Sequence, residues 1–225
     1  MKITDEIFQV GGGGLTSPED AAIYLINFGE GAALVDAGCG RSLEKVLNNM
    51  KTCGVRPEQI DYLLITHCHY DHTGGTKGIK DLTQCQVVAH ELDAQYLEKG
   101  DNTVTAAIWY GASFEPFSVD RKLTEKEEQI VLGDRHVKAI HTPGHSPGSV
   151  VYVAESGGLK VLFGQDIHGP LDARMLSNRE DYLHSLSLLV SLKADILCEG
   201  HYGVLRGRSE VEGFITSFVT GAGGP

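Results

Sequence analysis

The chain consists of short apolar runs separated by glycine-rich or polar connections. Runs of this kind, bounded by turn residues, are typical of buried β-strands. They occur in both halves of the chain, and several end beside a glycine and a residue with metal-binding chemistry. The pattern predicts strands at 3–10, 22–28, 32–35, 62–65, 86–89, 129–131, 137–140, 150–154 and 160–163, and a further buried strand within 194–200.

Helical spacing of apolar residues marks three of the segments between these strands. In 42–50 the apolar residues recur three and four positions apart, and Gly54 and Pro57 end the segment. The same spacing predicts helices at 91–98 and 182–192. Strands and helices in both halves indicate an α+β fold with two sheets packed face to face and helices outside. A chain of 225 residues can bury a full core, so we expect one domain over 1–225.

A dense group of metal-binding side chains follows the run at 62–65. His67, His69, Asp71 and His72 lie within six consecutive positions. Imidazole suits zinc, iron and manganese, and a carboxylate adds the negative charge that neutralises a divalent ion. Four such donors cannot all reach one tetrahedral ion without crowding. We therefore expect them to divide between two adjacent ions, with His67 and His69 on one and Asp71 and His72 on the other.

Three further donors lie in similar settings later in the chain. His145 is in a turn rich in proline and glycine, and Asp166 and His201 each follow an apolar run and lie near a glycine. Loops that follow strands gather at one edge of a sheet, so these residues can join the first four. The carboxylate of Asp166 has two oxygens and can bridge two ions. The sequence thus offers seven donors for two divalent metal ions.

The order of these motifs, HxHxDH, TPGHSPGS, FGQD and EGH, resembles the metallo-β-lactamase superfamily, and within it the glyoxalase II-like hydrolases. The resemblance covers nearly the whole chain up to about His201. It implies a four-layer αβ/βα sandwich of two mixed sheets with outer helices, and two ions, with zinc expected and iron or manganese as alternatives. It assigns His67, His69 and His145 to the first ion, Asp71, His72 and His201 to the second, and Asp166 to the bridge.

The same resemblance implies a binuclear metal-dependent hydrolase acting on an ester-like bond, such as a thioester or lactone of a small molecule. A hydroxide that bridges the two ions is the expected nucleophile, oriented by Asp71 or Asp166 as catalytic residues. The classical glutathione-binding members carry a helical domain after the last metal histidine. Only about 24 residues follow His201 here, which argues against glutathione thioesters. The aspartate at 166, where true β-lactamases have cysteine or serine, argues against antibiotic hydrolysis.

Two other functions stay open at this point. Mono-iron persulfide dioxygenases share the HxHxDH motif, and in that case His67, His145 and Asp166 would hold a single iron. A non-catalytic binding module on the same fold is the third alternative, which the complete set of donors disfavours. About two metal ions per chain favour the hydrolase, whereas a single iron with oxygen consumption favours the dioxygenase.

The segment 100–126 has an aromatic density above the rest of the chain. It contains Trp109, Tyr110, Phe114 and Phe117, and it lies between His72 and His145 in sequence. Apolar and aromatic walls are typical of small-molecule pockets, so we expect a lid over the site. The alternative is a helix packed over the sheet edge with its aromatic side chains in the core.

Charge and cysteine usage limit the partners and the compartment. A net charge of −11 argues against nucleic acid and anionic membranes as partners, and leaves a small-molecule substrate. The five cysteines include no C-x-x-C pair, so no disulfide framework is implied. The acidic start of the chain lacks the features of a signal peptide. We therefore expect a cytoplasmic protein, and the sequence indicates no particular oligomeric state.

Overall fold

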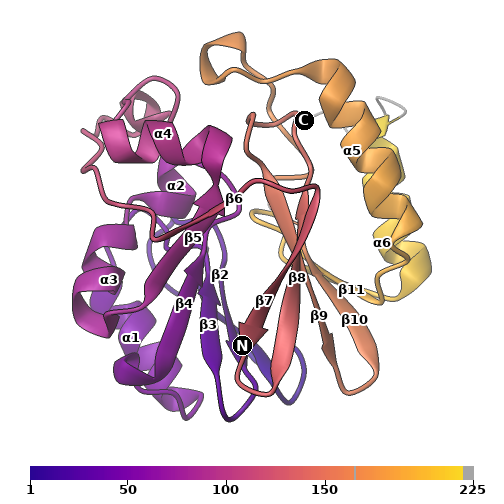
Figure 1. The fold of residues 1–225 in the computed structure, drawn as a ribbon. Helices are drawn as coiled ribbons and strands as arrows, with labels where there is room; N and C mark the ends of the chain where they lie inside the picture. The colour runs from indigo at the N-terminus through magenta and orange to yellow at the C-terminus, as the bar shows by residue number, and fades with distance from the viewer. Residues whose placement is uncertain (165, 220–225) are drawn as a thin grey trace.

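The computed structural model describes residues 1–164 and 166–219 and contains two six-stranded sheets packed face to face (Figure 1). The first sheet contains, in spatial order, β1 (Ile7–Gly11), β2 (Ile23–Asn27), β3 (Ala32–Val35), β4 (Ile60–Leu64), β5 (Gln86–His90) and β6 (Arg121–Leu123). The second contains β12 (Val204–Arg206), β11 (Ile196–Cys198), β10 (Leu159–Phe163), β9 (Val150–Ser156), β8 (Arg135–His141) and β7 (Glu127–Leu132).

Strand direction brings the ends of several strands to one edge of the sandwich. In the first sheet β3, β4, β5 and β6 are parallel, and β1 and β2 are joined to them by antiparallel pairing. In the second sheet β10 and β11 are parallel and the other neighbours are antiparallel. A hydrogen bond from the Val150 N–H at the start of β9 to the Thr66 carbonyl just after β4 joins the two sheets at this edge.

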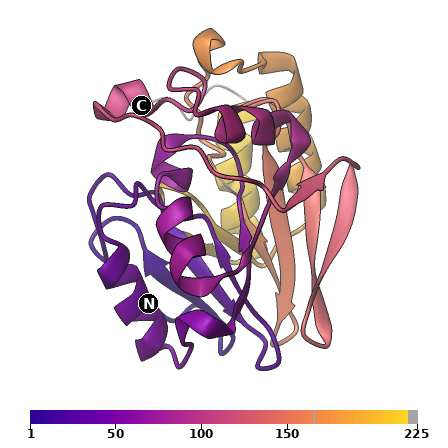
Figure 2. The same ribbon diagram turned by 60° about the vertical axis from the view of Figure 1, so that its left-hand side comes forward.

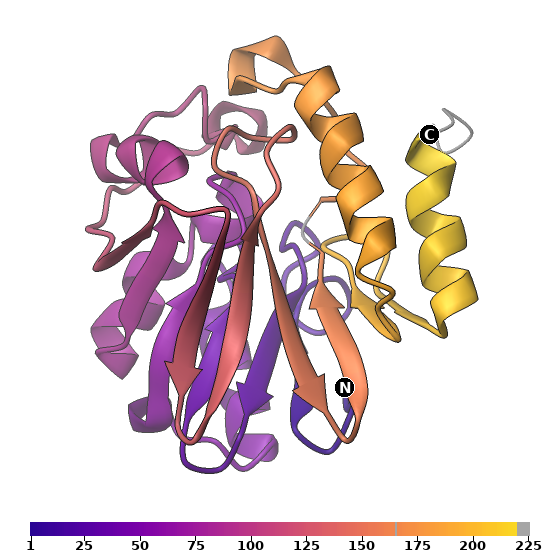
Figure 3. The ribbon, with the colours of Figure 1, turned by 45° about the vertical axis from the view of Figure 1, so that its right-hand side comes forward.

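Helices cover both outer faces. On the first sheet lie α1, α3 and α4 (Figure 2), and on the second α5 and α6 lie side by side (Figure 3). The helices are α1 (Leu43–Thr52), α2 (Tyr70–Thr73), α3 (Thr76–Thr83), α4 (Glu91–Lys99), α5 (Arg179–Ser191) and α6 (Arg208–Val219), with short 3₁₀ helices η1 (Pro57–Gln59), η2 (Ala107–Tyr110) and η3 (Ala173–Met175). No helix formed by residues 1–164 or 166–219 has both the length and the apolar character needed to cross a bilayer.

The layer between the sheets is the central core of the molecule. Large side chains fill it from both sides, among them Tyr24 and Leu64 from the first sheet and Tyr152 and Phe163 from the second. One further apolar layer lies under the helices on each outer face. These layers are the four-layer αβ/βα sandwich of two mixed sheets that the family resemblance predicted, and the fold class is confirmed.

Several bounds differ from the sequence prediction for local reasons. The first strand begins only at Ile7, because the Thr4 hydroxyl accepts hydrogen bonds from the N–H groups of Glu6 and Ile7 and forms a turn. Helix α5 begins at Arg179, three residues earlier than expected, because the side chain of Asn178 caps it. The sequence pattern missed α3, β6 and β12. In α3 and β6 some polar residues are buried or partly buried, and β12 has only three residues.

Neighbouring positions on β7 provide a test of the central layer. Ile130 is fully buried between the sheets, whereas the side chain of Val131 points outward and is 65% exposed. Ile130→Ala should lower the free energy of unfolding by about 2–5 kcal/mol through lost burial and a cavity. Val131→Ala should change it by less than about 0.5 kcal/mol. Urea unfolding of both variants measures the difference, and equal losses would contradict the assignment of strand faces.

Candidate metal centre

The HxHxDH segment changes from extended to helical backbone within a few residues. His67 and His69 lie in the loop after β4, with extended backbone at His69, and Asp71 and His72 belong to the single turn of α2. The N–H groups of His72 and Thr73 donate to the His69 carbonyl, which fixes this turn. The change of direction aims His67 and His69 at one point and Asp71 and His72 at another.

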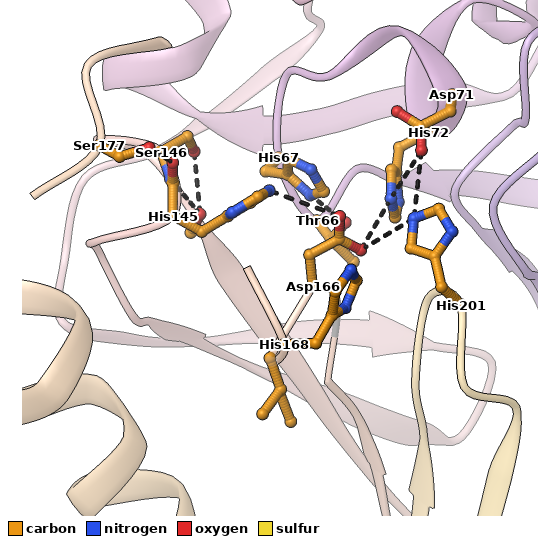
Figure 4. Close-up of polar contacts among 12 residues, drawn as sticks. Thr66, His67, Asp71, His72, His145, Ser146, Asp166, His168, Ser177 and His201 are labelled. Carbon is orange, nitrogen blue, oxygen red and sulfur yellow. Dashed lines mark hydrogen bonds and ion pairs between the residues drawn. The ribbon is translucent and has the colours of Figure 1, made fainter. Parts of the chain in front are cut away.

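The structure brings all seven predicted donors together at one edge of the sandwich. Figure 4 labels all of them except His69. His145 comes from the loop between β8 and β9, Asp166 from the segment after β10, and His201 from the segment after β11. The donors form two groups, in each of which the donor atoms lie within 4.8 Å of one another. The first group is His67, His69, His145 and Asp166, and the second is Asp71, His72, His201 and Asp166.

Asp166 is the member common to both groups, and each of its oxygens faces a different group. Its Oδ2 lies 3.5 Å from His145 Nε2. Its Oδ1 lies 3.0 Å from His72 Nε2 and 3.4 Å from His201 Nε2. In the second group, His201 Nε2 also lies 3.2 Å from Asp71 Oδ2. The side chain of His201 is 34% exposed, whereas the other donors are buried, so His201 lies on the solvent side of the cluster.

The chemistry of these residues fits metal ions. Among the described residues, Nε2 of His67, His69 and His145 is buried and forms no hydrogen bond. Buried polar atoms in proteins nearly always have a partner, and a metal ion supplies one for a ring nitrogen. The ring centroids of these three histidines lie 4.5–4.7 Å apart, so their nitrogens converge on a common point.

The protonation states of His67, His69 and Asp166 are those of metal ligands. Burial, reinforced by His72 and the other neighbouring histidines, lowers the pKa of His67 well below its usual value. Burial and His145 lower the pKa of His69 to about 3. Burial alone would raise the pKa of Asp166, but His72, His145 and His201 together hold it well below its usual value. Neutral imidazoles beside an ionised carboxylate are ready to bind a cation.

Asp36 supports the segment that carries His67 and His72. It directly follows β3, and its carboxylate accepts hydrogen bonds from Thr66 N at 2.8 Å and Thr66 Oγ at 2.7 Å. It also lies 2.7 Å from His72 Nδ1. A carboxylate on one ring nitrogen orients the imidazole and leaves the other nitrogen for a metal. Asp36 thus aims Nε2 of His72 at Asp166.

Sequence reasoning missed Asp93, which joins two of the metal-binding loops. This buried residue of α4 accepts hydrogen bonds from Cys68 N at 2.9 Å, Ser146 Oγ at 2.6 Å and Gly148 N at 2.7 Å. Gly148 permits the contact, since a Cβ there would lie 2.6 Å from Asp93 N. Asp93 therefore holds the loop of His67 and His69 against the loop of His145. In the sequence it reads only as an acidic residue in the first turn of a helix.

Glu199, just before His201, was also missed. It is fully buried, and its Oε2 accepts hydrogen bonds from the N–H groups of His201 at 2.7 Å and Tyr202 at 2.8 Å. Its Oε1 lies 2.9 Å from His168 Nδ1. His168 is outside both four-membered groups, but with Glu199 and Asp166 it forms a third group of potential metal donors.

A cavity of about 120 Å³ lies directly over the donors. Trp109 and Tyr110 of η2 line it together with His168, Pro170 and Met175. Phe114 and Phe117, from the same aromatic segment as Trp109, are buried in the core under the helices of the first sheet. The segment 100–126 therefore contains both cavity-lining and core aromatic residues.

Replacing Asp93 tests whether it holds the two loops together. Asp93→Ala removes the acceptor for two buried N–H groups, so it should weaken metal binding by about 10–100-fold, the usual effect of losing a residue that orients ligands. The exposed Glu91 in the same helical turn provides the control, and Glu91→Ala should bind as wild type. Competition with a chromophoric chelator measures both affinities. Equal affinities for the two variants would contradict the role of Asp93.

Comparison with known proteins places this site in a family. The model of the metallo-beta-lactamase superfamily matches residues 16–201. A probable metallo-hydrolase of Methanocaldococcus jannaschii is 30% identical over 133 residues, which are 59% of this chain but only 62% of that protein. The acyl-coenzyme A thioesterase MBLAC2 of Homo sapiens is 28% identical over 247 residues, covering 97% of this chain and 86% of that protein.

Among solved structures, the subclass B3 metallo-beta-lactamase BJP-1 of Bradyrhizobium japonicum has a TM-score of 0.79 and 26% identity. The superposition covers 99% of this chain and 91% of that one. The family match thus spans most of the chain, and it includes every one of the seven donors, from His67 to His201. With the two-sheet fold and this cluster of histidines and aspartates, it shows that the chain belongs to the metallo-beta-lactamase superfamily.

Proposed function

We propose that this protein is a binuclear metal-dependent hydrolase that cleaves a thioester or lactone of a small molecule, as the glyoxalase II-like members of the family do. The observation that carries the proposal is the position of Asp166, whose two oxygens face two separate groups of donors. A mono-iron site of His67, His145 and Asp166 would leave Asp71, His72 and His201 gathered around the same carboxylate without a role. The geometry therefore favours two ions over the dioxygenase alternative.

The proposed ligands are His67, His69 and His145 for the first ion, Asp71, His72 and His201 for the second, and Asp166 for both. Histidine-rich sites with carboxylates suit zinc, which we propose as the native metal, with iron and manganese as alternatives. Bound divalent ions would lower the pKa of water enough to supply hydroxide near neutral pH and would polarise a substrate carbonyl.

The chain's own residues supply orientation and shape. Asp71 and Asp166 line the cavity, where their carboxylates accept hydrogen bonds from an attacking water molecule and orient it. Trp109 and Met175 flank the cavity and exclude bulk water from the reacting bond. His201, the exposed donor, lies where a substrate enters. This arrangement needs no serine or cysteine nucleophile.

Apolar side chains around the cavity support a substrate with an apolar acyl group. Ile108 and Trp109 in η2 and Leu176 directly after η3 are large hydrophobic side chains left 43–49% exposed. The two segments approach each other over the cavity, where the Arg174 guanidinium lies 5.7 Å from the Trp109 ring. Apolar walls with few polar groups are typical of small-molecule sites. The thioesterase name of the human relative agrees with this substrate class.

The cytoplasmic location and the lack of a nucleic-acid partner remain predictions.

Metal content tests the binuclear proposal. Protein purified without added metal should carry about two ions per chain and hydrolyse acyl thioesters or lactones. Asp166→Ala should lower the occupancy of both sites together because both groups share this carboxylate. Elemental analysis measures the stoichiometry, with Asp5→Ala, a 93% exposed aspartate, as the control. Loss of only one ion from Asp166→Ala would contradict the bridging role, and a single iron with oxygen consumption would favour the dioxygenase.

The proposed lid is tested at Trp109. Because Trp109 is 47% exposed, Trp109→Ala should lower stability by less than the roughly 3–5 kcal/mol expected for a buried aromatic residue. It should lower activity toward a long-chain thioester about tenfold more than toward a short one, with metal content unchanged. Leu159→Ala, at a similarly exposed hydrophobic residue that begins β10 and is outside the cavity lining, is the control. A strongly destabilised Trp109→Ala variant with an unchanged preference for chain length would contradict the role of this segment as a lid.

A further inference from the structure

Two short segments carry metal donors past the ends of strands in opposite sheets. We name 65–67, which follows β4 and ends at His67, the first metal loop. We name 199–201, which follows β11 and ends at His201, the second metal loop. Each loop belongs to one sheet, and each forms hydrogen bonds across the sandwich to the other sheet.

The first metal loop is held by β9 of the second sheet. The hydroxyl of Tyr152 donates to the carbonyl of Ile65 at 2.8 Å. The N–H of Val150 donates to the carbonyl of Thr66 at 2.7 Å. The two acceptors are the two residues that immediately precede His67.

The second metal loop is held in the same way from the first sheet. The hydroxyl of Tyr24, in β2, donates to the carbonyl of Glu199 at 2.7 Å. The N–H of Ala22, one residue before β2, donates to the carbonyl of Gly200 at 2.8 Å. The two acceptors are the two residues that immediately precede His201.

The two sets of contacts have the same geometry. In the first set the second sheet supplies the hydrogen-bond donors, and in the second set the first sheet supplies them. In each, a tyrosine and the residue two positions before it bind the two carbonyls before a metal-ligand histidine. We infer that Tyr24 and Tyr152 are positioning residues, each of which holds the metal loop of the opposite sheet at the spacing that the two ions require. This inference rests on the proposed binuclear site.

The burial of both tyrosines makes them suited to this role. Tyr24 is 2% exposed and Tyr152 is fully buried, and both rings pack in the layer between the sheets. A ring held by packing places its hydroxyl at a fixed point. Without that hydroxyl, the carbonyl of Ile65 or Glu199 loses its partner across the sandwich, and the loop shifts to find another. The histidine two residues further along then moves with it.

Two matched substitutions separate a positioning role from a general loss of stability. Tyr152→Phe and Tyr24→Phe each remove one hydroxyl and keep the ring. Tyr62→Phe is the control, since Tyr62 packs against the same layer but its hydroxyl forms no hydrogen bond within 1–164 and 166–219. Zinc titration against a chromophoric chelator resolves the two binding steps, which His69→Ala and His201→Ala assign to the first and second ion.

Tyr152→Phe should weaken binding of the first ion by about 10–100-fold and leave the affinity for the second ion nearly unchanged. Tyr24→Phe should do the reverse, and Tyr62→Phe should change neither. Equal effects of both variants on both ions, or an equal effect of the control, would overturn the positioning role. Wild-type protein that takes up fewer than two ions would instead contradict the proposed function.

Amide hydrogen exchange in metal-free protein provides a second measurement that does not depend on the metal. Tyr152→Phe should speed exchange of the Val150 N–H, which bonds to the first metal loop, and leave the Ala22 N–H protected. Tyr24→Phe should expose the Ala22 N–H and leave the Val150 N–H protected. Uniformly faster exchange at both amides would show a global loss of stability and would overturn the inference.

Discussion

The carboxylate of Asp166 is buried among three histidines. The arrangement of loops at this edge of the sandwich follows from the contacts that compensate its negative charge. A buried carboxylate is unstable unless cations or hydrogen-bond donors surround it. Here its oxygens face His145 on one side and His72 and His201 on the other. Those histidines come from three different segments that follow strands, so segments of both sheets have to meet at one place.

Three other buried acidic residues make this meeting of loops stable. Asp36, Asp93 and Glu199 each accept hydrogen bonds from backbone N–H groups of a metal-binding loop. A buried N–H without a partner is costly, so these carboxylates stabilise loop conformations that the loops could not hold alone. The histidines are therefore placed by residues that lie outside the cavity, which is how ligand geometry is usually maintained in metal sites.

The sequence predicted which histidines and aspartates come together, because their chemistry is concentrated in short motifs after apolar runs. It predicted the fold class through the alternation of strands and helices and through family resemblance. It could not reveal Asp93, whose partners Cys68 and Gly148 are 25 and 55 residues away in the chain. Nor could it tell which aromatic residues of 100–126 line the cavity and which lie in the core. Only packing against the first sheet places Trp109 at the cavity and Phe114 in the core. Contacts between distant segments leave no local pattern.

The distribution of the donors over both sheets links metal binding to the folding of the sandwich. His67 and His201 belong to opposite sheets, and neither half of the chain has a complete set of donors by itself. An ion held in this way acts as a cross-link between distant parts of the chain. Since it binds the folded state alone, its free energy of binding adds directly to the free energy of unfolding and grows with the concentration of free metal. With metal bound as proposed, the concentration of free metal would therefore affect the stability of the fold as well as the proposed activity.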